Sequence, residues 1–149
     1  MTVIQSLEGF VAAIDNEICT VKAFVKLLKK EEDALIHGRI DELDMLASDK
    51  TRLVEKLESF SKQRKQYLSF LGYSPDKGGM NSWLTKQTNT ELREQWSQLI
   101  ELAKTAQQIN LTNGKVISTH LQYNQRTYLA LQSAAGNISL YGPKGQAFI

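Results

Sequence analysis

The chain has 149 residues, of which 42% are hydrophobic and 23% charged, and its formal net charge is +2. This length and composition are typical of a single soluble domain that buries a sizeable core without disulfides. Cys19 is the only cysteine, and the sequence has neither a signal-peptide pattern at its start nor an apolar run of about 20 residues. We therefore expect a cytoplasmic protein with no membrane insertion.

The first predicted element is a helix over about residues 3–36. Thr2 and Gln5 match a capping box at its start, and His37-Gly38 is a typical helix end. Between these signals the apolar residues alternate spacings of three and four, namely Ile4, Leu7, Val11, Ile14, Ile18, Val21, Val25 and Leu28, and Leu35 lies one step further on, after Glu32. Such a heptad seam needs a partner helix to cover it.

The second predicted helix covers about residues 41–71 and repeats this alternation with Leu43, Leu46, Leu53, Leu57, Phe60, Tyr67 and Leu71. Lys50 and Arg64 interrupt its seam. Their methylenes could lie on the core with the charged ends in water, or the charges could pair with acids on the first helix and set its register. Because the connection at Gly38 is short, the two helices should form an antiparallel hairpin.

Residues 72–79, with one proline and three glycines, predict a break in the helix. A short helix is expected over about residues 81–87. A longer one follows over about residues 89–135, opened by a capping box from Thr88 to Glu91. Its first apolar stripe contains Leu92, Trp96, Leu99, Ala103 and Ala106.

The predicted fold class is all-α. We expect an elongated antiparallel helical bundle over residues 1–136, with a long hairpin and a long third helix, and a short non-helical docking tail over residues 137–149. At about 1.5 Å per residue, the hairpin helices reach roughly 50 Å and the third helix roughly 70 Å. The last turns of the third helix should therefore lack complete cover, which favours a binding partner.

Patterns for enzymatic chemistry are missing from the sequence. Two histidines and one cysteine cannot make the usual structural zinc site, and no phosphate loop, dinucleotide fingerprint or nucleophile elbow is present. Residues 62–65 (KQRK) are one short basic run, whereas nucleic-acid surfaces normally cluster several cations. We therefore expect no enzyme activity, no metal or other cofactor, and no nucleic-acid partner.

The last third of the chain is unusual in its charge. Residues 102–149 contain no Asp or Glu, and their cations are Lys104, Lys115, Arg126 and Lys144. Such asymmetry often marks a surface that meets a partner.

Asparagines lie in the middle of one apolar face of this segment. At 100° per residue that face collects Ile109, Asn110, Asn113, Val116, Ile117, His120, Leu121, Asn124, Tyr128 and Leu131. Buried amides need hydrogen-bond partners, so they either form a polar layer inside the bundle or meet another helix. Gly114, which costs about 1 kcal/mol relative to alanine in mid-helix, would fit a kink or the close approach of another backbone.

The order of these residues resembles a known family. The resemblance is carried by Asn110, Asn113-Gly114, Ile117, Leu121, Asn124, Leu131, Leu140-Tyr141-Gly142 and Gly145-Gln146. In this order they resemble the FlgN family of flagellar type III export chaperones, as do the length, the hairpin with Lys50 and the long late helix. The resemblance implies a chaperone that holds hook–filament junction proteins and delivers them to the flagellar export gate, with the export ATPase complex as a further candidate partner.

The resemblance also implies roles for individual residues. The expected client-binding residues are Asn113, Gly114, Ile117, Leu121, Asn124, Tyr128 and Leu131. Leu140, Tyr141 and Gly142 are the expected docking element for the export gate. Alternatively, Leu140, Tyr141 and Phe148 could fold back onto the bundle, and the whole chain could be a structural coiled-coil adaptor that acts by self-association or helix pairing.

Overall fold

The computed structural model describes residues 6–134, which form four helices and no strand. The predicted all-α class is therefore confirmed. The helices are α1 (Leu7–His37), α2 (Ile40–Phe70), α3 (Lys77–Thr85) and α4 (Thr90–Ala134). The chain divides into two units, Met1–Ile109 and Asn110–Ile149, and α4 contributes to both. The predicted tail over residues 137–149 lies outside the described residues.

Side-chain and glycine caps define the bounds of α1. The predicted capping box of Thr2 and Gln5 lies outside the described residues, and α1 begins after Ser6, whose hydroxyl accepts a hydrogen bond from the Gly9 amide at 3.1 Å. The helix ends where predicted, because Gly38 adopts the left-handed conformation with φ 65°.

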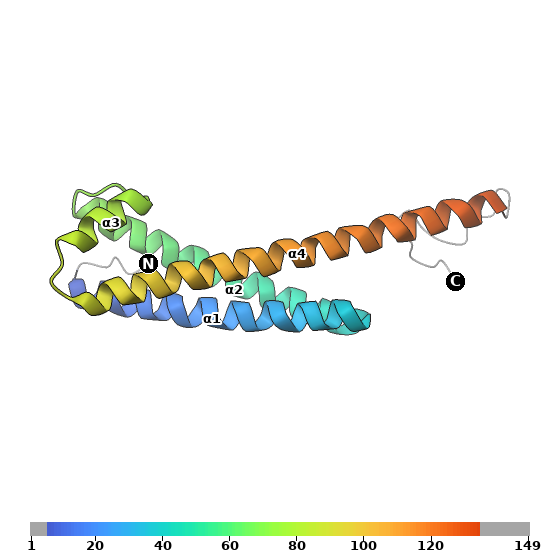
Figure 1. Cartoon of the computed structure of the whole chain (residues 1–149), viewed down its shortest axis with the longest axis horizontal. Helices are drawn as coiled ribbons and strands as arrows, with labels where there is room; N and C mark the ends of the chain where they lie inside the picture. Colours follow the sequence, from blue (N-terminus) through green and yellow to red (C-terminus); the bar gives the residue numbers. More distant parts are fainter. Residues whose placement is uncertain (1–5, 135–149) are drawn as a thin grey trace. The chain divides into compact units, whose positions relative to one another are not determined.

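In the first unit, α1 and α2 form the predicted antiparallel hairpin (Figure 1). The buried part of the α1 seam consists of Ile14, Ile18, Val21, Val25, Leu28 and Leu35. Phe10 and Phe24 are buried as well, so α1 buries a wider face than the seam. By contrast, α2 buries only Tyr67 and Leu68, and its other seam positions are half-buried or exposed. One side of α2 is therefore incompletely covered.

The helix α3 begins at Lys77, four residues before the predicted start. The Asp76 carboxylate accepts a hydrogen bond from the Gly79 amide at 2.8 Å and caps the helix. Residues 77–79, which were expected to belong to the break, are therefore helical. A Cβ at Gly79 would overlap the carbonyl group of Ser74, so the turn into α3 requires glycine at this position.

Another correction concerns the start of α4. Asn89, rather than the predicted Thr88, provides the cap, because its side-chain oxygen accepts a hydrogen bond from the Glu91 amide at 3.0 Å. The guanidinium of Arg93 donates to the carbonyl of Leu84 at 3.3 Å, to that of Thr85 at the end of α3, and to that of Gln87 just beyond it. The first turn of α4 therefore also satisfies the end of α3.

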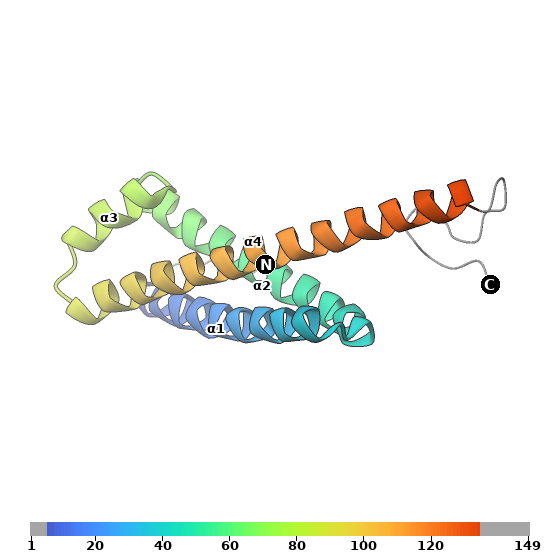
Figure 2. The ribbon, with the colours of Figure 1, turned by 45° about the vertical axis from the view of Figure 1, so that its right-hand side comes forward.

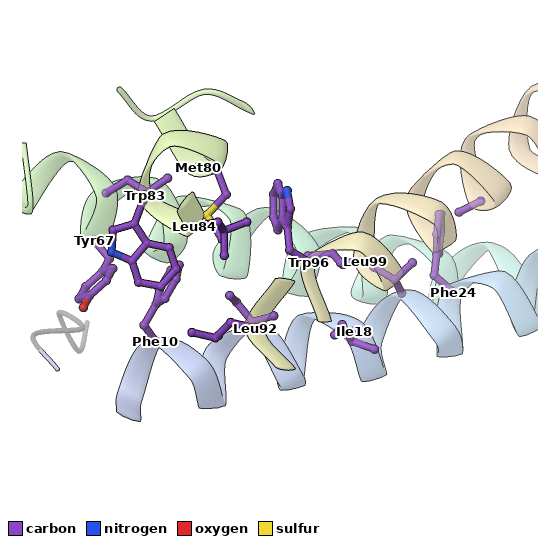
Figure 3. Close-up of a cluster of buried hydrophobic side chains, with 14 of the residues drawn as sticks. Phe10, Ile18, Phe24, Tyr67, Met80, Trp83, Leu84, Leu92, Trp96 and Leu99 are labelled. Carbon is purple, nitrogen blue, oxygen red and sulfur yellow. The ribbon is translucent and has the colours of Figure 1, made fainter. Parts of the chain in front are cut away.

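An aromatic cluster joins α1, α2 and α3. The rings of Phe10 and Tyr67 stack with centroids 4.4 Å apart, and Trp83 meets Phe10 edge-on at 4.9 Å (Figure 3). Burial raises the pKa of Tyr67 above its ordinary value. From α4, the predicted stripe contributes Leu92, Trp96, Leu99 and Ala106 to the same core. Figure 2 shows α3 between the end of α2 and the start of α4.

Candidate partner-binding surfaces

Two ion pairs cross the hairpin at the charged seam positions of α2. Lys50 contacts Glu31 at 3.2 Å, and Arg64 binds both carboxylate oxygens of Glu17 at 3.1 and 3.2 Å. Glu31 and Glu17 are 5% and 6% exposed, so each carboxylate needs its cation. Of the two sequence interpretations, pairing with acids on the first helix is therefore confirmed.

Arg64 also reaches a third helix. Its guanidinium carbon lies 5.0 Å from the centroid of the Trp96 ring on α4, within the range of a cation–π contact. One side chain thus joins the Glu17 carboxylate of α1, its own helix and an aromatic ring of α4 within the first unit.

The spacing of these pairs fixes the register of the hairpin. Glu17 and Glu31 are 14 residues apart, as are Lys50 and Arg64, so both pairs form in the same antiparallel alignment. A shift of one helix by one heptad would leave buried carboxylates without cations. The sequence already contained this signal, because Phe10, Glu17, Phe24 and Glu31 repeat every seven residues.

A groove of about 1070 Å³ lies between α1, α2 and the first part of α4, all within the first unit. Its apolar lining includes Phe24 of α1, Leu57 of α2, and Leu99 and Ile100 of α4. Phe70, which is 66% exposed, also lines it. Sequence reasoning missed this groove, although the half-buried seam of α2 is its physical cause.

The second unit contains the late part of α4, where the client-binding residues were predicted. Ile117 and Leu131 are each 37% exposed. Asn113 is 1% exposed, which places its amide in an intramolecular environment. A Cβ at Gly114 would meet no described atom within 4 Å. Two further leucines, Leu111 and Leu129, are each 60% exposed.

The other predicted site residues lie outside the described part of the chain. This applies to the side chains of Leu121, Asn124 and Tyr128 and to the whole gate-docking element, Leu140, Tyr141 and Gly142. The assignment of all these residues to client or gate binding stays a prediction.

Within the described residues 6–134, His, Cys, Asp and Glu side chains form no group of three or more that could hold a metal ion. None of the described helices combines the length and the apolar character that crossing a bilayer requires.

Comparison with known proteins identifies the family. The family model described as FlgN protein matches residues 1–147. The flagella synthesis protein FlgN of Proteus mirabilis is 25% identical, with 95% of this chain and 91% of that protein aligned. The protein of the same name from Yersinia enterocolitica (serotype O:8, biotype 1B) is 24% identical, with 90% and 86% aligned.

A solved structure has a similar fold. It is the crystal structure of a protein provisionally called a flagella synthesis protein FlgN, from Pseudomonas aeruginosa. The match has a TM-score of 0.69 at 24% identity and covers 76% of this chain and 90% of that one. Because the family model spans nearly the whole chain, we conclude that the chain belongs to the FlgN family.

Proposed function

We propose that this protein is a cytosolic export chaperone in flagellar assembly. It binds the amphipathic terminal helices of hook–filament junction proteins, keeps them from assembling prematurely, and delivers them to the type III export gate. Relatives named flagella synthesis proteins and the family match support a role in flagellar assembly. The finer role rests on the exposed apolar face of late α4.

The observation that carries this role is the exposure of Ile117 and Leu131 on a helix segment without acids. Both side chains are 37% exposed and lie about 40° apart at 100° per residue, so they share one face of α4. An amphipathic client helix could cover this face by helix-in-groove binding. Such binding involves no covalent chemistry and no cofactor.

The test is titration calorimetry of the full-length protein with the C-terminal helical segment of a junction protein from the same organism. We expect saturable 1:1 binding. Leu131→Ala should weaken it by about tenfold, since a truncated apolar contact in an interface costs about 1–2 kcal/mol. Asn124→Ala should also weaken binding while the helical circular dichroism is retained.

Leu129→Ala is a matched control on the same helix. Leu129 is 60% exposed and points about 160° away from Leu131, so its truncation should leave client binding unchanged. Equal losses in the two leucine variants would contradict the assigned face. Self-association in place of client binding would favour a coiled-coil adaptor instead.

Delivery to the export gate requires a second surface, which we assign to Leu140, Tyr141 and Gly142. Tyr141→Ala should leave client binding unchanged and reduce binding to the purified cytosolic domain of the gate, because a tyrosine can supply a large apolar contact with one hydroxyl. Loss of both interactions in this variant would contradict the division between helix and tail.

A further inference from the structure

The groove of the first unit is a second candidate binding surface, separate from the late part of α4. We propose that it binds an acidic amphipathic α-helix of three to four turns that belongs to a partner protein. This inference does not depend on which protein binds the face of Ile117 and Leu131. It rests on the dimensions, the lining and the charges of the groove.

The dimensions of the groove match a helix of this length. Its lining extends over residues 54–70 of α2 and residues 96–107 of α4. At 1.5 Å per residue these stretches are roughly 24 Å and roughly 16 Å long, which corresponds to about 11 to 16 helical residues. A volume of about 1070 Å³ leaves room for a row of apolar side chains.

The lining suits the apolar face of such a helix. Phe24 and Leu57 contribute apolar surface from the hairpin, and Leu99 and Ile100 contribute it from α4. Phe70 lies at the end of α2 with 66% of its surface exposed, although it is a large apolar residue. An apolar groove between helices is the usual receptor for an amphipathic helix.

Charge distinguishes between the possible occupants. Lys62 and Lys65 line the groove on α2 and are exposed, and neither forms an ion pair among the described residues. Glu58, one turn earlier, is the acid beside them, while the Arg64 charge is already paired with Glu17. The lining residues of α4 carry no charge. Acids that flank the apolar face of the bound helix would therefore meet the two lysines.

The same charges disfavour the last third of this chain as the occupant. Residues 102–149 contain four cations and no acid, so neither the late part of α4 nor the tail could neutralise Lys62 and Lys65. This holds for the same residues of a second copy as well as for those of the same molecule. An acidic segment from another protein satisfies the charges and the apolar lining together.

Trp96 provides a direct test, because its side chain lines the groove. Two synthetic peptides of about 14 residues are compared, with leucines at helical i, i+3, i+4 and i+7 spacing and either Glu or Lys at the flanking positions. The Glu peptide should shift the Trp96 emission of the full-length protein saturably. The Lys peptide should bind about tenfold more weakly. Trp96→Phe should remove the response and leave the buried Trp83 as a constant background.

Charge reversal locates the binding site. Lys62→Glu combined with Lys65→Glu should invert the preference between the two peptides. Lys26→Glu combined with Lys29→Glu is the matched control, since these lysines are also exposed, have the same spacing and do not line this groove. Failure of both peptides to bind, or equal effects of the two reversals, would overturn the proposal.

Other occupants would give different results. Self-association that Ile100→Asp abolishes would identify a second copy of the chain. A change of Trp96 emission in Phe148→Ser without any peptide would identify the tail. Either result would overturn the proposal, and neither involves the junction-protein segment used to test the proposed function.

Discussion

Two buried carboxylates determine how the hairpin of this FlgN family member aligns. Glu17 and Glu31 occupy positions where an apolar side chain would pack, and each is stabilised by one cation from α2. A buried ion pair adds little net stability, but removal of one partner leaves an uncompensated charge. The pairs therefore contribute mainly to specificity of register.

This view predicts a non-additive response to substitution. Glu17→Ala should lower the free energy of unfolding by about 3 kcal/mol, because Arg64 would keep a largely buried charge. Glu17→Leu combined with Arg64→Met should cost much less, since no buried charge remains. Urea unfolding followed by circular dichroism measures both.

The exposed pair of Asp49 and Arg52, 3.8 Å apart, is a control for the ion-pair measurement. Arg52→Ala should change the free energy of unfolding by at most about 0.5 kcal/mol. A combined Glu17 and Arg64 variant that lost the sum of the two single-substitution costs would contradict the role assigned to the pair.

Asp76 predicts a dependence of stability on pH. The pKa of this carboxyl is lowered below its ordinary value of 3.8, mainly by a hydrogen bond from the Gly79 amide and next by one from the Ser74 side chain. Because this pKa is lower in the folded state, the Asp76 carboxylate stabilises the fold when the pH is above its pKa in the unfolded state. This stabilisation is lost as the pH falls through its pKa in the folded state. The native protein should therefore exceed Asp76→Asn in free energy of unfolding by less on acidification below about pH 4.

Urea unfolding at about pH 6 and about pH 3 measures the free energy of unfolding of the native protein and of Asp76→Asn. The other carboxyls titrate alike in both proteins, so their effect cancels in the difference. Asp76→Ala is the control, because it removes the cap at every pH. A difference between the native protein and Asp76→Asn that is independent of pH would exclude the carboxylate as its source.

At the scale of elements, the helices differ in how much of their extent could be predicted from sequence. The heptad seam and Gly38 predicted α1 and the hairpin, because spacing and a left-handed glycine act locally. The early start of α3 was not predicted, since Asp76 can cap only once Gly79 packs beneath the Ser74 carbonyl. Such a contact depends on the three-dimensional course of the 74–79 turn, which the residue pattern alone does not give.

Glycines in two helices predict opposite responses to alanine. Gly114→Ala should stabilise late α4 by about 1 kcal/mol, because helix propensity rises and its Cβ would meet no described atom within 4 Å. Gly79→Ala should lower the free energy of unfolding by about 1–3 kcal/mol, because its Cβ would overlap the Ser74 carbonyl group.

Amide hydrogen exchange around residue 114 measures the first glycine effect, and urea unfolding measures the second. If Gly114→Ala protects the local amides and also weakens client binding, close approach of a client backbone is supported. Slower exchange without a change in client binding would assign the glycine no part in recognition.

For the whole molecule, fold class and family could be predicted from sequence better than binding surfaces could. Periodicity identifies the helices. The sequence order of particular residues between Asn110 and Gln146 indicated the family that the comparison confirms. The groove could not be predicted in this way, because it requires knowing that three helices leave one side of α2 uncovered. Exposure likewise depends on the fold, since the pattern did not separate buried Asn113 from exposed Ile117.

The attachment of α2 at both ends has a mechanical consequence. Gly38 joins one end to α1, and the stacked rings of Phe10 and Tyr67 hold the other end against Trp83. Between these two points the pairs Lys50–Glu31 and Arg64–Glu17 tie α2 to α1, although most side chains of α2 are half-buried or exposed. The helix is therefore held at intervals along its whole length and cannot pivot away from α1. Helices of different thickness would then be accommodated by the side chains that line the groove, without opening the hairpin.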